Sequence, residues 1–131
     1  MAIKIFRFSA NHFDWESTDE ALTKKTLGGK GAALVKMAQA GMPVPPGFTI
    51  TTDTCNEFRL LKETQTEEVV NKWFDKLMDE VNMNMKWLAD QFGYTPLVSV
   101  RSGAPVSMPG MMDTILNVGL TYDNLSEWEK R

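Results

Sequence analysis

The chain has 131 residues, of which 43% are hydrophobic and 24% are charged, and its formal net charge is −3. These values are typical of one globular domain, and the net charge provides no positive field that would attract nucleic acid or an anionic membrane. Cys55 is the one cysteine, which excludes an intrachain disulfide and, with no secretory leader expected, predicts a cytoplasmic location. No stretch approaches the roughly 20 apolar residues of a membrane-spanning helix, so neither nucleic acid nor a membrane is expected as a partner.

The N-terminal third predicts a strand, a polar connection and a helix. Apolar residues alternate imperfectly over residues 3–8, which indicates a β-strand. Residues 9–26 are polar and are expected to form a loop that can include one helical turn. Residues 30–39 predict a helix that ends at a cap on Gly41. The three prolines in residues 42–47 exclude a helix there, because proline removes amide donors and fixes φ.

The middle of the chain predicts a strand and two helices. Residues 48–51 are rich in residues that favour strands, and Thr51 or Thr52 can cap a helix that continues to Leu61. Residues 66–92 predict one long amphipathic helix, because apolar residues recur at helical spacing. This stripe consists of Val70, Phe74, Leu77, Val81, Met85, Leu88 and Phe92.

The C-terminal third predicts a return to strands. Gly93 is expected to end the long helix, and residues 97–101 to form a strand. Residues 115–120 fit either a strand or the start of a helix, and residues 124–131 an incipient helix. The predicted fold class is α+β, a small sheet with helices packed on it, in a single domain over residues 1–131.

A glycine-rich segment around Lys30 is a candidate phosphate site. A helix N-terminus carries a partial positive charge, so a lysine there is repelled unless an anion is present. Gly28, Gly29 and Gly31 remove side chains near Lys30 and permit positive φ, which leaves amides available for an anion. The segment lacks the spacing of a Walker A loop. The alternative is a glycine-rich turn whose lysine lies in water.

A second candidate phosphate ligand is Arg101, at the end of the strand predicted over residues 97–101. Its guanidinium can project beyond the sheet, and its fork of N–H donors suits bidentate phosphate binding. The loop that follows has backbone amides that can add contacts. We assign to it the candidate residues Ser107, Met108, Pro109, Gly110 and Met111. The alternative is that Arg101 pairs with a carboxylate such as Asp113.

Four segments of the chain resemble the pyruvate phosphate dikinase family, in the same order. They are residues 27–34 (Leu-Gly-Gly-Lys-Gly-Ala-Ala-Leu), residues 41–52 with their three prolines, residues 98–104 (Val-Ser-Val-Arg-Ser-Gly-Ala) and residues 107–117 (Ser-Met-Pro-Gly-Met-Met-Asp-Thr-Ile-Leu-Asn). The similarity is to the N-terminal part of the family's nucleotide-binding domain and covers nearly the whole chain.

The resemblance implies a nucleotide-binding function. The family's domain is similar to an ATP-grasp fold, with two lobes around MgATP, and this chain resembles the first lobe. Lys30 and Arg101 match residues that hold the nucleotide phosphates, and residues 107–111 match the loop that covers them. The full family converts ATP, pyruvate and phosphate to AMP, phosphoenolpyruvate and diphosphate, and it uses a phosphohistidine domain and a barrel domain that this sequence does not contain.

Three features of the sequence depart from a complete dikinase. No phosphohistidine motif is present, and His12 is expected to be a surface residue. The second lobe, which would supply the magnesium ligands, is also missing, so we assign no catalytic residue and no metal ligand. Pro105 stands where the family usually has another arginine, which removes one positive charge from the expected phosphate site.

Three functions remain open from the sequence. The first is an ATP-binding module that depends on Mg²⁺ ligands from elsewhere. The second is a stand-alone non-catalytic protein that binds a partner, such as a dikinase-like enzyme. The third is a structural oligomer that buries the surface where a second lobe would pack.

Overall fold

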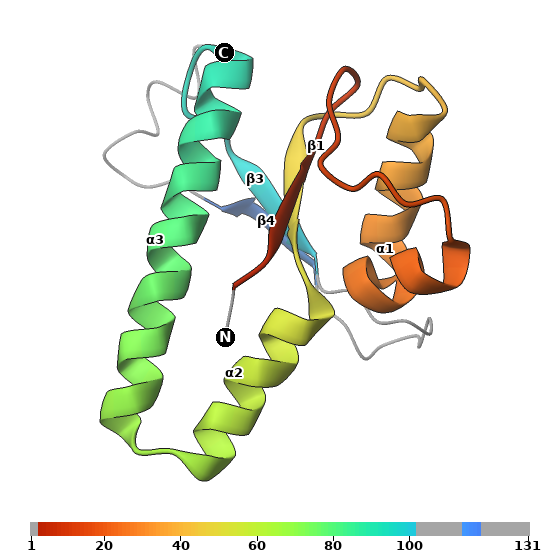
Figure 1. The fold of residues 1–131 in the computed structure, drawn as a ribbon. Helices are drawn as coiled ribbons and strands as arrows, with labels where there is room; N and C mark the ends of the chain where they lie inside the picture. The colour runs from red at the N-terminus through yellow and green to blue at the C-terminus, as the bar shows by residue number, and fades with distance from the viewer. Residues whose placement is uncertain (1–2, 102–113, 119–131) are drawn as a thin grey trace.

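The computed structural model describes residues 3–101 and 114–118, and these form an α+β fold (Figure 1). Their elements, in chain order, are β1 (Ile5–Phe8), α1 (Glu20–Gln39), β2 (Gly47–Ile50), α2 (Thr52–Thr64), α3 (Glu67–Phe92), β3 (Val98–Arg101) and β4 (Thr114–Val118). The expected class is confirmed. The strands form two separate two-stranded sheets, however, where one small sheet was predicted.

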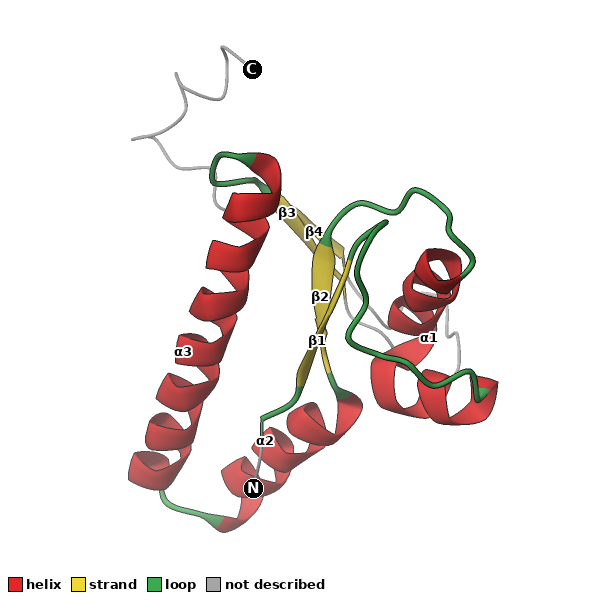
Figure 2. Cartoon of the chain, turned by 45° about the horizontal axis from the view of Figure 1, so that its top comes forward, coloured by secondary structure: helices red, strands yellow, loops and turns green. Residues whose placement is uncertain are grey.

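Both sheets are antiparallel pairs of strands. β1 pairs with β2 so that Phe8 lies opposite Gly47, and β3 pairs with β4 with an irregularity between Val98 and Val100. For residues 115–118, which lie in β4, the alternative of a strand is confirmed, and residues 119–120 lie outside the described residues. α3 lies on one side of β1 and β2 and α1 lies on the other (Figures 1 and 2).

The prediction of a loop over residues 9–26 is wrong for its last third, because α1 already begins at Glu20. The Asp19 side chain accepts a hydrogen bond from the amide of Leu22 at 3.1 Å, which caps the helix in the usual way. Most side chains of this first segment are exposed and only Thr23 and Leu27 are buried, so apolar residues recur there too rarely to indicate a helix. The capping aspartate was the available signal.

The predicted ends of the other helices agree closely with the structure. Gly41 has φ 79°, and the amide of Met42 bonds to the carbonyl of Met37, which is a Schellman motif. α2 continues to Thr64, three residues beyond its predicted end. α3 is capped by Thr66 and ended by Gly93 in the left-handed region.

The core lies between α1 and the first sheet. Its buried members are Phe8, Leu27, Val35, Ala38 and Val44. The long stripe on α3 is only partly buried, because Leu88 is 3% exposed whereas Phe74 is 43% exposed and Phe92 is 38% exposed. α3 packs chiefly on α2, where Trp73 stacks on Phe58 with ring centroids 5.3 Å apart.

Candidate nucleotide-phosphate site

Helix α1 is broken at Gly28. This residue has φ 77° and ψ 172°, a conformation that is essentially confined to glycine. The helix therefore consists of two segments, and Lys30 lies in the first turn of the second. The predicted helix over residues 30–39 corresponds to this second segment, and the expectation of positive φ is confirmed at Gly28.

The neighbouring glycines play different roles from the one predicted. Neither Gly29 nor Gly31 is among the described glycines with positive φ. A Cβ at Gly31 would lie 3.1 Å from Cγ2 of Thr49 and 3.1 Å from Cβ of Leu27. Gly31 therefore allows the second segment of α1 to approach β2 closely, which positions the segment that carries Lys30.

Lys30 is exposed and is available to a ligand. Among the described residues it forms no ion pair and no side-chain hydrogen bond. By contrast, Lys36 on the same helix donates to Glu20 at 2.6 Å. This bond lowers the pKa of the Glu20 carboxyl and raises the pKa of Lys36, chiefly through the hydrogen bond and then through the attraction of the charges.

Arg101 is the last residue of β3 and is exposed, as predicted. It lies opposite Thr114 of β4 in the strand register. Among the described residues, Arg101 forms no ion pair and no side-chain hydrogen bond. The predicted loop ligands at residues 107–111, Pro105 and the alternative partner Asp113 lie outside the described residues.

The described residues contain no group of three or more His, Cys, Asp or Glu side chains that could hold a metal ion. His12 is exposed, as predicted, and its Nε2 lies 2.7 Å from Oδ1 of Asp14. Within residues 3–101, no helix is long and apolar enough to cross a membrane.

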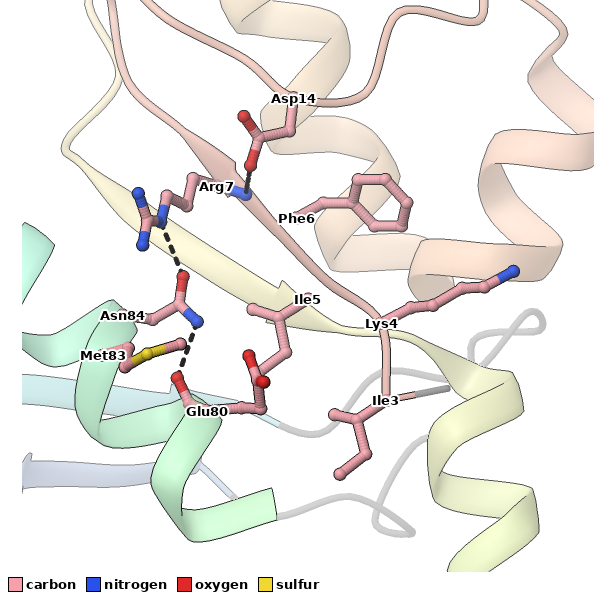
Figure 3. A pocket seen from close by; sticks show the side chains of 9 residues that line it. All are labelled: Ile3, Lys4, Ile5, Phe6, Arg7, Asp14, Glu80, Met83 and Asn84. Carbon is pink, nitrogen blue, oxygen red and sulfur yellow. Dashed lines mark hydrogen bonds between the residues drawn. The ribbon is translucent and has the colours of Figure 1, made fainter. Parts of the chain in front are cut away.

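A polar cluster that was not predicted from the sequence lies between β1 and α3 (Figure 3). Nε of Arg7 donates to Oδ1 of Asn84 at 2.7 Å, and the guanidinium lies 5.2 Å from the centroid of the Trp87 ring. Asn84 is 5% exposed. A signal was available, because Asn84 stands between Val81 and Leu88 at apolar-stripe spacing.

Comparison with known proteins identifies the family. Residues 24–130 match the family model described as pyruvate phosphate dikinase, AMP/ATP-binding domain. The chain belongs to this family. The match includes both segments of the candidate site, from Gly28 to Arg101.

Full-length dikinases are similar to this chain over most of its length. A pyruvate, phosphate dikinase of Giardia intestinalis is 45% identical over 117 residues, which cover 84% of this chain and 12% of that protein. One of Entamoeba histolytica is 47% identical over 108 residues, which cover 77% of this chain and 11% of that protein. The chain thus spans about an eighth of the length of these relatives.

A third relative bears on the expected location. The pyruvate, phosphate dikinase 1 of Oryza sativa subsp. japonica, named as chloroplastic, is 38% identical over 120 residues, which cover 89% of this chain and 12% of that protein. Family membership is therefore compatible with more than one compartment, and the cytoplasmic location stays a prediction.

Proposed function

We propose that this dikinase-family domain binds the phosphate groups of ATP or AMP through Lys30, Arg101 and the loop at residues 107–111. The observation that carries the proposal is the break at Gly28, which starts a new helical segment beside the exposed Lys30. The break lies inside the region that matches the AMP/ATP-binding domain model.

The chemistry of Lys30 supports an anionic ligand. The first amides of a helical segment lack intrahelical acceptors, and they attract phosphate together with the helix dipole. A lysine at this end of a helix is disfavoured by the same dipole until an anion neutralises it. Bound phosphate thus relieves an unfavourable arrangement around Lys30, and Arg101 adds a planar fork of donors.

Membership of the dikinase family is the basis for the architecture that we propose. Residues 1–131 would form one domain that corresponds to the first lobe of an ATP-grasp-like nucleotide-binding unit. Mg²⁺ would arrive bound to ATP and would take its protein ligands from a second lobe, since the described residues hold no cluster of acids. Conversion of pyruvate to phosphoenolpyruvate would require the phosphohistidine and barrel domains of a longer dikinase.

A non-catalytic role in protein association is the second candidate. The exposed rings of Phe74 and Phe92 on α3 favour it, since apolar patches on a protein surface often mark interaction sites. Pro105 favours it too, because the family usually has an arginine there. In this case the partner would be a dikinase-like protein, a second lobe or another copy of the chain.

Calorimetric titration of MgATP into the 131-residue chain tests the nucleotide proposal. We expect saturable binding that Lys30→Ala and Arg101→Ala each weaken by roughly tenfold or more, as for charge-assisted hydrogen bonds. Lys24→Ala is the matched control, because Lys24 is an exposed lysine in the first segment of the same helix. Absence of saturable binding, or equal weakening by Lys24→Ala, would refute the assignment.

A further inference from the structure

The outer edge of β1 is the edge that faces away from β2. Along it, the backbone groups of one residue are hydrogen-bonded within the chain and those of another are not. The amide of Thr51 donates to the carbonyl of Lys4 at 3.1 Å, so the backbone groups of Lys4 face β2. Backbone groups alternate between the two edges of an antiparallel strand. Those of Ile5 and Arg7 therefore face away from β2.

Asp14 closes this edge at Arg7. The amide of Arg7 donates to Oδ2 of Asp14 at 2.9 Å, and the amide of Asp14 donates to the carbonyl of Arg7 at 2.9 Å. Asp14 thus satisfies both groups as a neighbouring strand would. Within residues 3–101, the amide and carbonyl of Ile5 have no such partner.

A pocket lies along this open part of the edge, between β1 and α3 (Figure 3). Its volume is about 470 Å³, and α3 contributes Glu80, Met83 and Asn84 to its lining. Ile3 and Ile5 line it from the strand side. This volume is within the roughly 300–1,000 Å³ of ligand pockets, and unpaired strand edges are templates for added strands.

Four charged side chains line the pocket, those of Lys4, Arg7, Asp14 and Glu80. Two of them with opposite charge, Arg7 and Glu80, form no ion pair among the described residues. Arg7 is held in place through its Nε by Asn84 and by contact with the Trp87 ring, which leaves its terminal N–H groups for an anion. The backbone carbonyl of Glu80 accepts from Nδ2 of Asn84 at 2.8 Å, while its carboxylate turns into the pocket beside Ile5 (Figure 3).

We propose that this pocket is a strand acceptor for an extended peptide segment with an acidic and a basic residue two positions apart. The segment pairs with the free backbone groups of Ile5 by β-augmentation. In antiparallel orientation its acidic side chain lies opposite Ile5 and reaches diagonally to Arg7. Its basic side chain lies opposite Ile3 and reaches Glu80. Asp14 sets the register, because it blocks pairing at Arg7.

The test uses the peptide acetyl-Val-Glu-Val-Lys-Val-amide and the full 131-residue chain. We expect saturable binding by NMR titration, with hydrogen exchange at the Ile5 amide slowed roughly tenfold or more at saturation. N-methylation of the peptide's glutamate amide removes one ladder hydrogen bond and should abolish binding. Replacement of its two charged residues by glutamine should weaken binding.

Two protein variants sharpen the test. Ile5→Pro removes the outward N–H without removing a bond to β2, which is where an edge strand tolerates proline, and it should abolish binding while Ile5→Val does not. Glu80→Gln should weaken binding, because it removes the negative charge that attracts the basic side chain of the peptide. The substitution leaves Asn84 in place, because the backbone carbonyl of Glu80 and not its carboxylate holds Asn84. Asp79→Asn, at an exposed position on the same helix, should leave binding unchanged.

Three results would overturn the proposal. They are the absence of saturable binding, equal binding of the N-methylated peptide, and unchanged exchange at the Ile5 amide in the presence of saturating peptide. A fourth result would show that the bound strand comes from another copy of this chain and not from a separate peptide segment. If the chain alone sediments as a dimer that Ile5→Pro dissociates, and its Ile5 amide is already protected, the strand acceptor is filled by a second copy.

Discussion

Glu20 and Lys36 form an ion pair across the break in α1. Nζ of Lys36 lies 2.6 Å from Oε1 of Glu20, although 16 residues separate them. In an uninterrupted helix these residues would be about 24 Å apart along the axis. The helix must therefore turn back on itself between them, and Gly28 is where its backbone departs from helical geometry.

Substitution of Gly28 by alanine should destabilise the chain. Its backbone conformation is open to glycine and costs other residues about 1–3 kcal/mol, so we expect a loss of that size in the free energy of unfolding measured with urea. Gly29→Ala is the control, because Gly29 has no positive φ and alanine favours a helix by up to about 1 kcal/mol. Equal loss in both variants would show that the break does not depend on Gly28.

Gly47→Ala should also destabilise the folded chain, because there is no room for the added methyl group. A Cβ at Gly47 would lie 2.5 Å from Cζ of Phe8, and Phe8 is buried in the core. We expect a cost of about 1–3 kcal/mol, as for overpacking in other cores, measured as a lower midpoint of urea unfolding. Phe8→Leu should be less harmful in the Gly47→Ala background than alone, and an additive double variant would contradict the steric account.

Asn84→Ala should destabilise by about 1–3 kcal/mol, because it removes the buried acceptor of Nε of Arg7 and leaves that donor unsatisfied. Asn84→Asp retains an acceptor and should be tolerated better. Asn82→Ala, at an exposed position on α3, is the control. Thermal unfolding of the three variants measures the difference, and equal midpoints for Asn84→Ala and Asn82→Ala would argue against the contact.

Cys55 should react slowly with iodoacetamide. Cys55 is exposed as a residue, but partial burial of its sulfur raises the pKa of the thiol, an effect that the charge of Arg59 partly offsets. The thiolate is the nucleophile, so raising the pKa lowers the reactive fraction at neutral pH. The pH at half-maximal alkylation rate should be higher for the folded chain than for the same chain in denaturant. A lower value when folded would show that the charge of Arg59 outweighs burial.

The features that were predicted correctly are those that depend on interactions between residues close together in the chain. Thr66 and Gly93 specify the ends of α3 through bonds within a few residues of themselves, so the sequence alone predicted them. The first segment of α1 was not predicted, because most of its side chains are exposed and apolar residues do not recur there at helical spacing. The exposure of Phe74 could not be predicted, because its spacing fits the helix while its burial depends on what packs against it.

The candidate site divides in the same way. Local sequence patterns predicted Lys30 beside glycines and Arg101 at a strand end. The order of the motifs indicated the family. The fold class, most helix caps and the family could be predicted from the sequence, since they depend on residues close together in the chain. Two contacts could not be predicted in this way: Thr49 approaches Gly31 closely, and Arg7 donates to Asn84, which is 77 residues away. Such contacts depend on the packing of whole elements rather than on spacing along the chain.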